Sequence, residues 1–200
     1  MKVLIVTGGI GSGKSSACRF LEKEYGWPVY SADSKVKDLY VTSPSLLDSI
    51  EAELGGRFRD DNGVFAPGML ASVIFSSTEA LKTVEDLVFP ELTRDFESWK
   101  AKHADCRYVI LESATILEKP SLCHLGDVTI LIDAPIEVRL SRTSSRDGAT
   151  EDAVRSRMDK QPLMNSISEG KIEADVDYVV LNDSTEAELQ QKLIKIAEML

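Results

Sequence analysis

A glycine-rich loop near the N-terminus carries the residues best suited to phosphate chemistry. The sequence reads GGIGSGKS from Gly8 to Ser15. Glycines let successive backbone N–H groups turn inward around phosphate oxygens, while Lys14 adds a cation that can reach the β- and γ-phosphates. The Ser15 hydroxyl is suited to ligate Mg²⁺. The pattern predicts a bound nucleoside triphosphate, and the residues expected to hold it are Gly9, Ile10, Gly11, Ser12, Gly13, Lys14, Ser15 and Ser16.

The segments on either side of this loop support the prediction. The apolar run VLIVT before it is typical of a buried strand, and SSACRFLEKEYG after it is typical of a helix that ends at Gly26. A helix that starts here directs the positive end of its dipole at the phosphates. A glycine turn with an accidental Lys-Ser pair is the alternative, and it would not need both flanking elements.

Phosphoryl transfer to a hydroxyl also needs a carboxylate that accepts the proton. Asp33 is the candidate, because it is expected at the carboxyl end of the second strand, where ligands of parallel sheets gather. The alternative is that Asp33 caps a helix starting at Ser34. Glu112 and Asp133 are also expected at strand ends, and either one can support the Mg²⁺ shell through water.

Basic residues gather in the second half of an acidic chain. The net charge is −10, which argues against nonspecific binding to nucleic acid or an anionic membrane. Arg139, Arg142 and Arg146 lie within eight residues. Such a cluster suits a bound polyphosphate, whereas the alternative for each arginine is a solvated helix face.

The apolar segments predict the fold class. Residues 3–7, 108–113, 128–133 and 178–182 are typical of buried parallel strands, and residues 27–33 are a shorter fifth candidate. Helical segments separate them, so we expect an α/β phosphate-loop kinase fold in which a five-stranded parallel sheet is flanked by helices. Thr185 and Glu188 have the spacing of a capping box, which predicts a last helix from 184 to 200.

Two stretches of this single domain are longer than the one helix needed to connect two neighbouring parallel strands. The expected core covers about residues 1–33, 104–138 and 171–200. Residues 34–103 are expected to form a helical insertion that holds the acceptor, and residues 139–170 an Arg-rich lid that closes over the nucleotide and excludes water.

Several local signals place helices within these stretches. Ser43-Pro44 predicts a helix start and Gly55-Gly56 its end, while residues 60–63 predict a turn. Pro67 and Thr78 can each open a further helix, and the stripe Leu92, Phe96 and Trp99 is typical of core packing. Thr150 is expected to cap a helix in the Arg-rich segment.

The remaining features bound the kind of protein. The 200 residues include Cys18, Cys106 and Cys123, an odd set without metal-ligand spacing, which we interpret as reduced thiols. No apolar run approaches the roughly 20 residues needed to cross a bilayer. The first expected strand follows Met1 almost at once, so we expect no signal or transit peptide and a cytoplasmic location. A monomer or a weak homo-oligomer is expected.

The phosphate loop, Asp33, the helical insertion and the Arg-rich segment together favour an ATP-dependent small-molecule kinase. Neither a guanine-reading Asn-Lys-x-Asp element nor GTPase switch loops are present, and large ATPase motors need more chain. Another nucleoside, nucleotide or small-molecule kinase, or a non-catalytic ATP-binding regulatory protein, stays open as an alternative. A screen of acceptors separates these readings.

The chain resembles the dephospho-CoA kinase family in a series of motifs that follow one another in the same order as in that family. The resemblance rests on VTGGIGSGKSS, YSADSKVKDLY, DDNGVFAPGMLASVIF, ESATILE, the Arg-rich DAPIEVRLSRTSSRDGATEDAVRSRMDKQ, and ADVDYVVLNDS. It implies that ATP and Mg²⁺ are used to phosphorylate the ribose 3′-hydroxyl of dephospho-CoA, the final step of coenzyme A synthesis. The residues with implied roles are Asp33, Lys14 and Arg146 in catalysis, Arg142 and Asn182 toward ATP, Lys37 and Glu118 toward the acceptor, and Gln161 without an assigned role.

Four positions depart from the family pattern. Ser31 replaces the first Asp of a DAD element, which points to Asp33 as the proton acceptor. Lys37 stands where Arg is usual and loses the bidentate fork. Pro67 stands where Arg is frequent, and Phe89 replaces His before Pro90. The departures concern the acceptor side and leave the ATP side intact.

Overall fold

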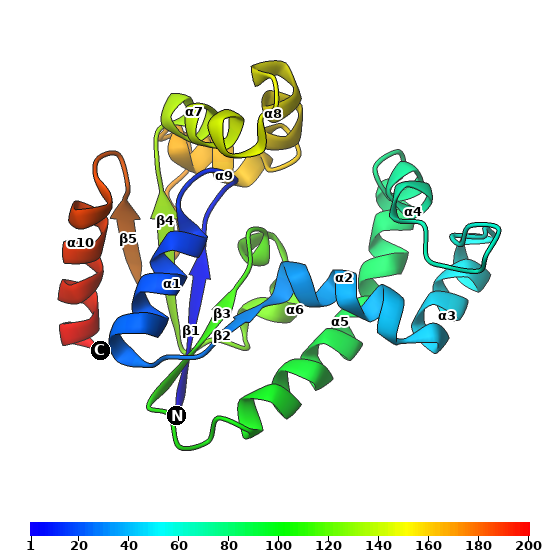
Figure 1. Ribbon diagram of the computed structural model, residues 1–200, viewed down its shortest axis with the longest axis horizontal. Helices are drawn as coiled ribbons and strands as arrows, with labels where there is room; N and C mark the ends of the chain where they lie inside the picture. The colour runs from blue at the N-terminus through cyan, green and yellow to red at the C-terminus, as the bar shows by residue number, and fades with distance from the viewer. The chain divides into compact units, whose positions relative to one another are not determined.

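Five parallel strands form the sheet that carries the glycine-rich loop in a computed structural model that describes residues 1–200 (Figure 1). The strands are β1 (Lys2–Thr7), β2 (Val29–Ser31), β3 (Tyr108–Glu112), β4 (Val128–Asp133) and β5 (Tyr178–Leu181). Their order is β2-β3-β1-β4-β5, and every neighbouring pair is parallel. The predicted fold class is therefore confirmed, and the central β1 carries the loop.

The sheet forms where the sequence concentrates buried aliphatic residues. Leu4 and Val6 of β1 are fully buried against the helices α1 (Lys14–Tyr25) and α10 (Glu186–Met199), which pack on the same face through Leu21 and Leu193. Val3 and Ile5, which point to the opposite face, are buried as well. Burial on both faces explains the nearly continuous apolar runs. Thr185 Oγ1 accepts a hydrogen bond from Glu188 N, so α10 starts slightly later than the predicted residue 184.

Strand β2 is shorter than residues 27–33, and this corrects the placement of Asp33. The ladder with β3 ends at Ser31, paired with Glu112, and helix α2 (Ala32–Thr42) begins at the next residue. Asp33 lies in the first turn of α2, neither on the strand nor at the cap of a helix starting at Ser34. An acidic side chain in the first turn interacts favourably with the positive end of the helix dipole.

The Arg-rich stretch folds into three helices after β4. These are α7 (Ile136–Asp147), α8 (Glu151–Met158) and α9 (Pro162–Ser168). The expected lid boundary at residue 139 falls inside α7, which begins at Ile136 because Pro135 occupies its N-cap. Thr150 caps α8 as predicted, accepting a hydrogen bond from Ala153 N. Between β3 and β4 lie a short 3₁₀ turn, η1 (Ile116–Glu118), and α6 (Pro120–Cys123).

Residues 32–102 are mainly helical, with an isolated antiparallel bridge between Arg59 and Phe65. Besides α2 they contain α3 (Pro44–Leu54), α4 (Pro67–Ile74) and α5 (Thr78–Ala101). Pro67 occupies the first turn of α4, and Gly55 ends α3 in a left-handed conformation, both as predicted. Phe89 packs against the buried cluster of these helices, so two of the departures have structural roles here.

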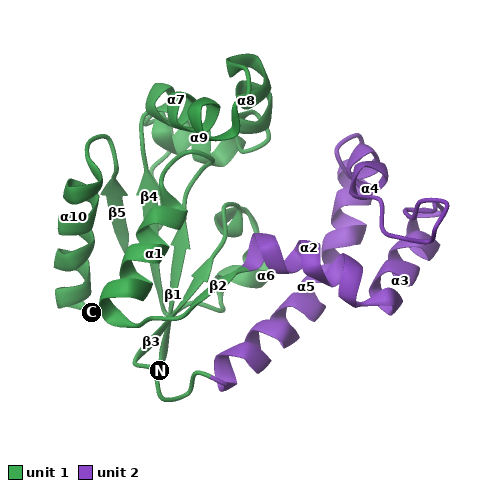
Figure 2. Ribbon diagram, viewed as in Figure 1, with its two compact units in different colours: residues 1–31, 103–200 green, residues 32–102 purple.

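The chain divides into two compact units (Figure 2). Unit 1 comprises residues 1–31 and 103–200, and unit 2 comprises residues 32–102. Each has its own buried cluster. Within the 200 described residues, no helix has the length and apolar character needed to span a bilayer. All three cysteines are free, and burial raises the pKa of the Cys18 thiol.

Candidate active site

The glycine-rich loop connects β1 to the N-terminus of α1. Gly11 and Gly13 have φ values of 79° and 101°, in the left-handed region that favours glycine. A Cβ atom on Gly13 would lie 2.2 Å from Asn182 Nδ2, so a side chain here would also displace Asn182. Ser12 N donates to Gly9 O at 3.1 Å, which closes the turn. The backbone thus takes the form that a phosphate cradle requires, at the positive end of a helix of 12 residues.

Lys14, Ser15 and Glu112 come together beside the loop. Ser15 Oγ donates to Glu112 Oε1 at 3.0 Å, and Lys14 Nζ lies 3.7 Å from the same oxygen. The parallel register of β1 and β3 pairs Val6 with Glu112, which places this carboxylate at the end of its strand and next to the loop. The side chains of Lys14 and Glu112 are each 12% exposed. A cation, a hydroxyl and a carboxylate therefore share one partly buried site.

Asp133, the other acid considered for this role, is engaged elsewhere. Its Oδ1 accepts a hydrogen bond from Ser168 Oγ at 2.5 Å. Burial lowers the pKa of Arg139, and the charge of Asp133 offsets part of this effect. The backbone carbonyl of Asp133 accepts from Asn182 N at 2.6 Å. The structure therefore joins Glu112 to Ser15 and Asp133 to α9.

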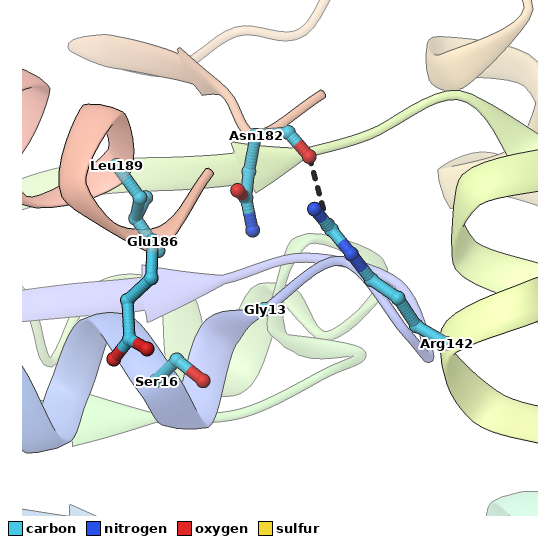
Figure 3. A pocket seen from close by; sticks show the side chains of 6 residues that line it. All are labelled: Gly13, Ser16, Arg142, Asn182, Glu186 and Leu189. Carbon is cyan, nitrogen blue, oxygen red and sulfur yellow. Dashed lines mark hydrogen bonds between the residues drawn. The ribbon is translucent and has the colours of Figure 1, made fainter. Parts of the chain in front are cut away.

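A cavity of about 240 Å³ adjoins the start of α1 (Figure 3). It is lined by Gly13, Ser16, Arg142, Asn182, Glu186 and Leu189. Asn182 is buried and donates from Nδ2 to Ser12 O at 2.8 Å, which ties the end of β5 to the loop. Arg142 donates to the carbonyls of Asn182, at 2.8 Å, and Ser184, at 3.1 Å. The structure thus brings the two predicted ATP-side residues Arg142 and Asn182 to one cavity.

Arg146 lies at the exposed end of α7 and is paired with Asp147. Arg146 Nε donates to Asp147 Oδ1 at 2.6 Å, and Arg157 donates to Oδ2 at 2.8 Å. These hydrogen bonds, first that of Arg146 and then that of Arg157, lower the pKa of Asp147 to about 2. The side chain of Arg146 is 63% exposed. Both arginines thus share one carboxylate in this structure.

The predicted acceptor residues are distributed over both units. Asp33 and Lys37 are exposed and one turn apart on α2, so they lie on the same face of that helix in unit 2. Glu118 ends η1 in unit 1, where its Oε1 is buried without a hydrogen-bond partner. Leaving a carboxylate oxygen buried without a hydrogen bond is energetically costly, and such an oxygen is suited to accept a hydrogen bond from a bound ligand.

Sequence reasoning missed contacts at the tip of the loop. Ile10 N donates to Gln161 Oε1 at 2.8 Å, and Ile10 O accepts from Arg139 Nε at 2.9 Å. Arg139 is fully buried, so for this residue the alternative of a solvated helix face is wrong. The sequence carried one signal for this burial, because Arg139 shares a helix face with Leu140 and Thr143, the other buried residues of α7. Glu186 and Leu189 of the cavity were not anticipated either.

Comparisons with known proteins agree with this geometry. A family model described as dephospho-CoA kinase matches residues 2–188. The chain is 36% identical over 177 residues to the dephospho-CoA kinase of Porphyromonas gingivalis, covering 88% of this chain and 84% of that protein. It is 30% identical over 192 residues to the enzyme of the same name from Bacteroides fragilis, covering 96% and 90%.

Solved structures show the same fold. A crystal structure from Thermus thermophilus superposes with a TM-score of 0.80 at 26% identity, covering 100% of this chain and 97% of the other. A dephospho-CoA kinase from Campylobacter jejuni superposes with a TM-score of 0.61 at 21% identity, covering 98% and 95%. Shikimate kinase from Acinetobacter baumannii, at 14% identity and a TM-score of 0.53 with coverage of 100% and 94%, shares the fold alone. With its family model matched over nearly the full length and its phosphate loop, strand-end carboxylate and flanking helices in place, this chain belongs to the dephospho-CoA kinase family.

Proposed function

We propose that this protein transfers the γ-phosphoryl group of ATP to the ribose 3′-hydroxyl of dephospho-CoA, which yields coenzyme A in the cytoplasm. The observation that carries the proposal is the joint placement of Lys14, Ser15 and Glu112 at the loop between β1 and α1, in a chain of this family. Little covalent chemistry is required of the protein in such a transfer, so positioning and charge neutralisation supply most of the catalysis.

The nucleotide is expected to span the loop and the cavity beside it. The phosphates lie on residues 9–16, where backbone N–H groups and the Lys14 ammonium neutralise their charge. The adenine enters the cavity that Asn182 and Arg142 line. Since both side chains are already held by hydrogen bonds, little of their side-chain entropy is lost when the base binds.

The donor set at the loop fits Mg²⁺. Ser15 Oγ and the Glu112 carboxylate are hard oxygen ligands that lie 3.0 Å apart, and Mg²⁺ is usually held by one or two such groups together with substrate phosphates and water. We therefore assign Ser15 to the metal and Glu112 to its surrounding shell. When bound, Mg²⁺ neutralises charge on the β- and γ-phosphates.

On the acceptor side, Asp33 is assigned the role of orienting the 3′-hydroxyl and accepting its proton. Lys37 lies one turn away on the same face of α2, where its ammonium can contact acceptor phosphate. Glu118 has a buried Oε1 without a hydrogen-bond partner, which is suited to accept a hydrogen bond from dephospho-CoA. Arg146 is assigned to the transferring phosphoryl group, and it must exchange the carboxylate of Asp147 for that group.

The test is an ADP-release assay with Mg-ATP in which dephospho-CoA, adenosine, AMP, CMP and shikimate are offered separately. We expect transfer to dephospho-CoA alone, with coenzyme A identified by mass and phosphate position. Lys14→Ala is expected to nearly abolish turnover. Asp33→Asn is expected to lower turnover strongly and leave ATP affinity nearly unchanged. Transfer to another acceptor, or an Asp33→Asn variant that loses only thermal stability, would contradict the assignment.

A further inference from the structure

Both backbone polar groups of Ile10, at the tip of the phosphate loop, are held by side chains from the α7–α9 region. Arg139 Nε donates to Ile10 O at 2.9 Å, while Gln161 Oε1 accepts from Ile10 N at 2.8 Å. The peptide groups on both sides of Ile10 are thereby fixed in orientation. Because both peptide groups belong to the phosphate loop, these contacts restrict the conformation of the loop before a nucleotide binds.

Arg139 reaches Ile10 from a completely buried position. The residue has 0% exposure, and its terminal NH1 donates to Ser168 Oγ at 2.9 Å. Ser168 Oγ in turn donates to Asp133 Oδ1, so a continuous chain of hydrogen bonds runs from the loop through α7 and α9 to the end of β4. Burial lowers the pKa of Arg139, and the negative charge of Asp133 at the end of this chain offsets part of that effect.

The second terminal nitrogen of Arg139 lies against Gly9 and has no hydrogen-bond partner. A Cβ atom on Gly9 would be 2.1 Å from Arg139 NH2, so only glycine leaves room for the guanidinium. Burying an arginine with one donor unused is costly, and an apolar residue of similar volume would fill the space at lower cost. A purely structural role in the packing of α7 therefore explains this residue poorly.

We propose that Arg139 is a positioning residue for nucleotide binding, which sets the conformation of Gly9 and Ile10 from behind the loop and couples the loop to α7–α9. The proposal rests on the proposed function only in that the loop binds ATP, and it does not depend on the identity of the acceptor. It predicts a defect that is selective for ATP. A merely structural arginine would instead lower stability without such selectivity.

The experiment compares Arg139→Met and Arg139→Lys with Arg155→Met, a matched control on α8 whose arginine pairs with the exposed Glu137. The Kd for Mg-ATP is measured by calorimetry without acceptor, and KM for both substrates, kcat and Tm are measured in parallel. For Arg139→Met we expect Kd and KM for ATP to rise about tenfold or more, which corresponds to the loss of a charged hydrogen bond, while KM for dephospho-CoA changes less than about twofold. The control is expected to match the wild type.

Arg139→Lys separates charge from geometry, because a lysine cannot donate to Ile10 O and Ser168 Oγ through a planar fork. We expect it to recover only part of the ATP affinity. If Arg139→Met fails to fold, Ser168→Ala removes one anchor of the guanidinium and is expected to weaken ATP binding several-fold.

Wild-type ATP affinity in both Arg139→Lys and Ser168→Ala, or a loss of Tm in Arg139→Met without a selective change toward ATP, would overturn the proposal. The calorimetric measurement keeps the two proposals apart. A wild-type protein that binds Mg-ATP but ignores dephospho-CoA would contradict the proposed acceptor and leave the role of Arg139 standing.

Discussion

At the scale of single residues, the site is organised by Glu112 more than by any residue of the loop. Its Oε1 is the common partner of Ser15 Oγ and Lys14 Nζ, and it lies at the end of β3, beside β1. Without a bound nucleotide this carboxylate balances the charge of Lys14. Under the proposed function, the ATP phosphates would pair with Lys14, and Glu112 would support the Mg²⁺ shell.

Glu112→Gln is expected to raise the Mg²⁺ concentration needed for half-maximal activity about tenfold or more, because the amide keeps the volume and loses the charge. The measurement is turnover against Mg²⁺ concentration at saturating ATP. Asp133→Asn is the comparison, since its carboxylate contacts Ser168 and not Ser15. A larger Mg²⁺ requirement in Asp133→Asn than in Glu112→Gln would reverse the assignment of the two acids.

At the scale of elements, helix starts in unit 2 differ in how they are capped. Ser77 precedes α5 and its side chain accepts a hydrogen bond from Ala80 N at 3.1 Å. Ser43 precedes α3 with a Pro at the next position, and its side chain makes no cap hydrogen bond. The same residue type at equivalent positions therefore stabilises its helix to different extents.

Ser77→Ala is expected to lower the free energy of unfolding by about 1 kcal/mol, since Ala80 N loses its partner. Ser43→Ala is the matched control, and it is expected to lower the free energy of unfolding by only about a few tenths of a kcal/mol, because no cap hydrogen bond is lost. Chemical denaturation with urea measures both. Equal losses in the two variants would show that the cap hydrogen bond of Ser77 contributes nothing.

At the scale of the whole molecule, the chain forms two units with separate cores. The phosphate loop, Glu112 and the cavity of Asn182 all belong to unit 1. Asp33 and Lys37 belong to unit 2, which follows β2 directly in the sequence. Glu118, the other residue proposed for the acceptor, belongs to unit 1, so the proposed acceptor residues come from both units.

Hydrogen exchange is expected to separate the two binding events. A non-hydrolysable ATP analogue with Mg²⁺ should slow exchange at residues 8–16 and 182–189 and leave residues 32–102 nearly unchanged. Dephospho-CoA added to the analogue-saturated protein should then slow exchange within residues 32–102, because a bound ligand raises the free energy of local opening. Saturation with the analogue keeps the adenosine of dephospho-CoA out of the ATP site. Absence of any protection in residues 32–102 would contradict the acceptor role of unit 2.

The five-stranded α/β fold, the phosphate loop and most helix ends could be predicted from the sequence, because these features depend on local signals. Apolar periodicity, the glycines at Gly55 and Gly13 and the cap at Thr150 act within one turn or one strand. The end of β2 was placed wrongly, since only the ladder with β3 shows that pairing stops at Ser31.

The contacts between residues far apart in the sequence could not be predicted in this way. Glu112 and Asp133 are alike in sequence, because each is an acid at the end of an apolar strand. In the structure, Glu112 accepts a hydrogen bond from Ser15, whereas Asp133 accepts one from Ser168. Arg139 was grouped with Arg142 and Arg146 as a cluster suited to a polyphosphate, with a solvated helix face as the alternative, whereas the structure buries it with its Nε on Ile10 O. Contacts between residues separated by 97 or 129 positions depend on strand order and helix packing, which short-range sequence patterns do not encode.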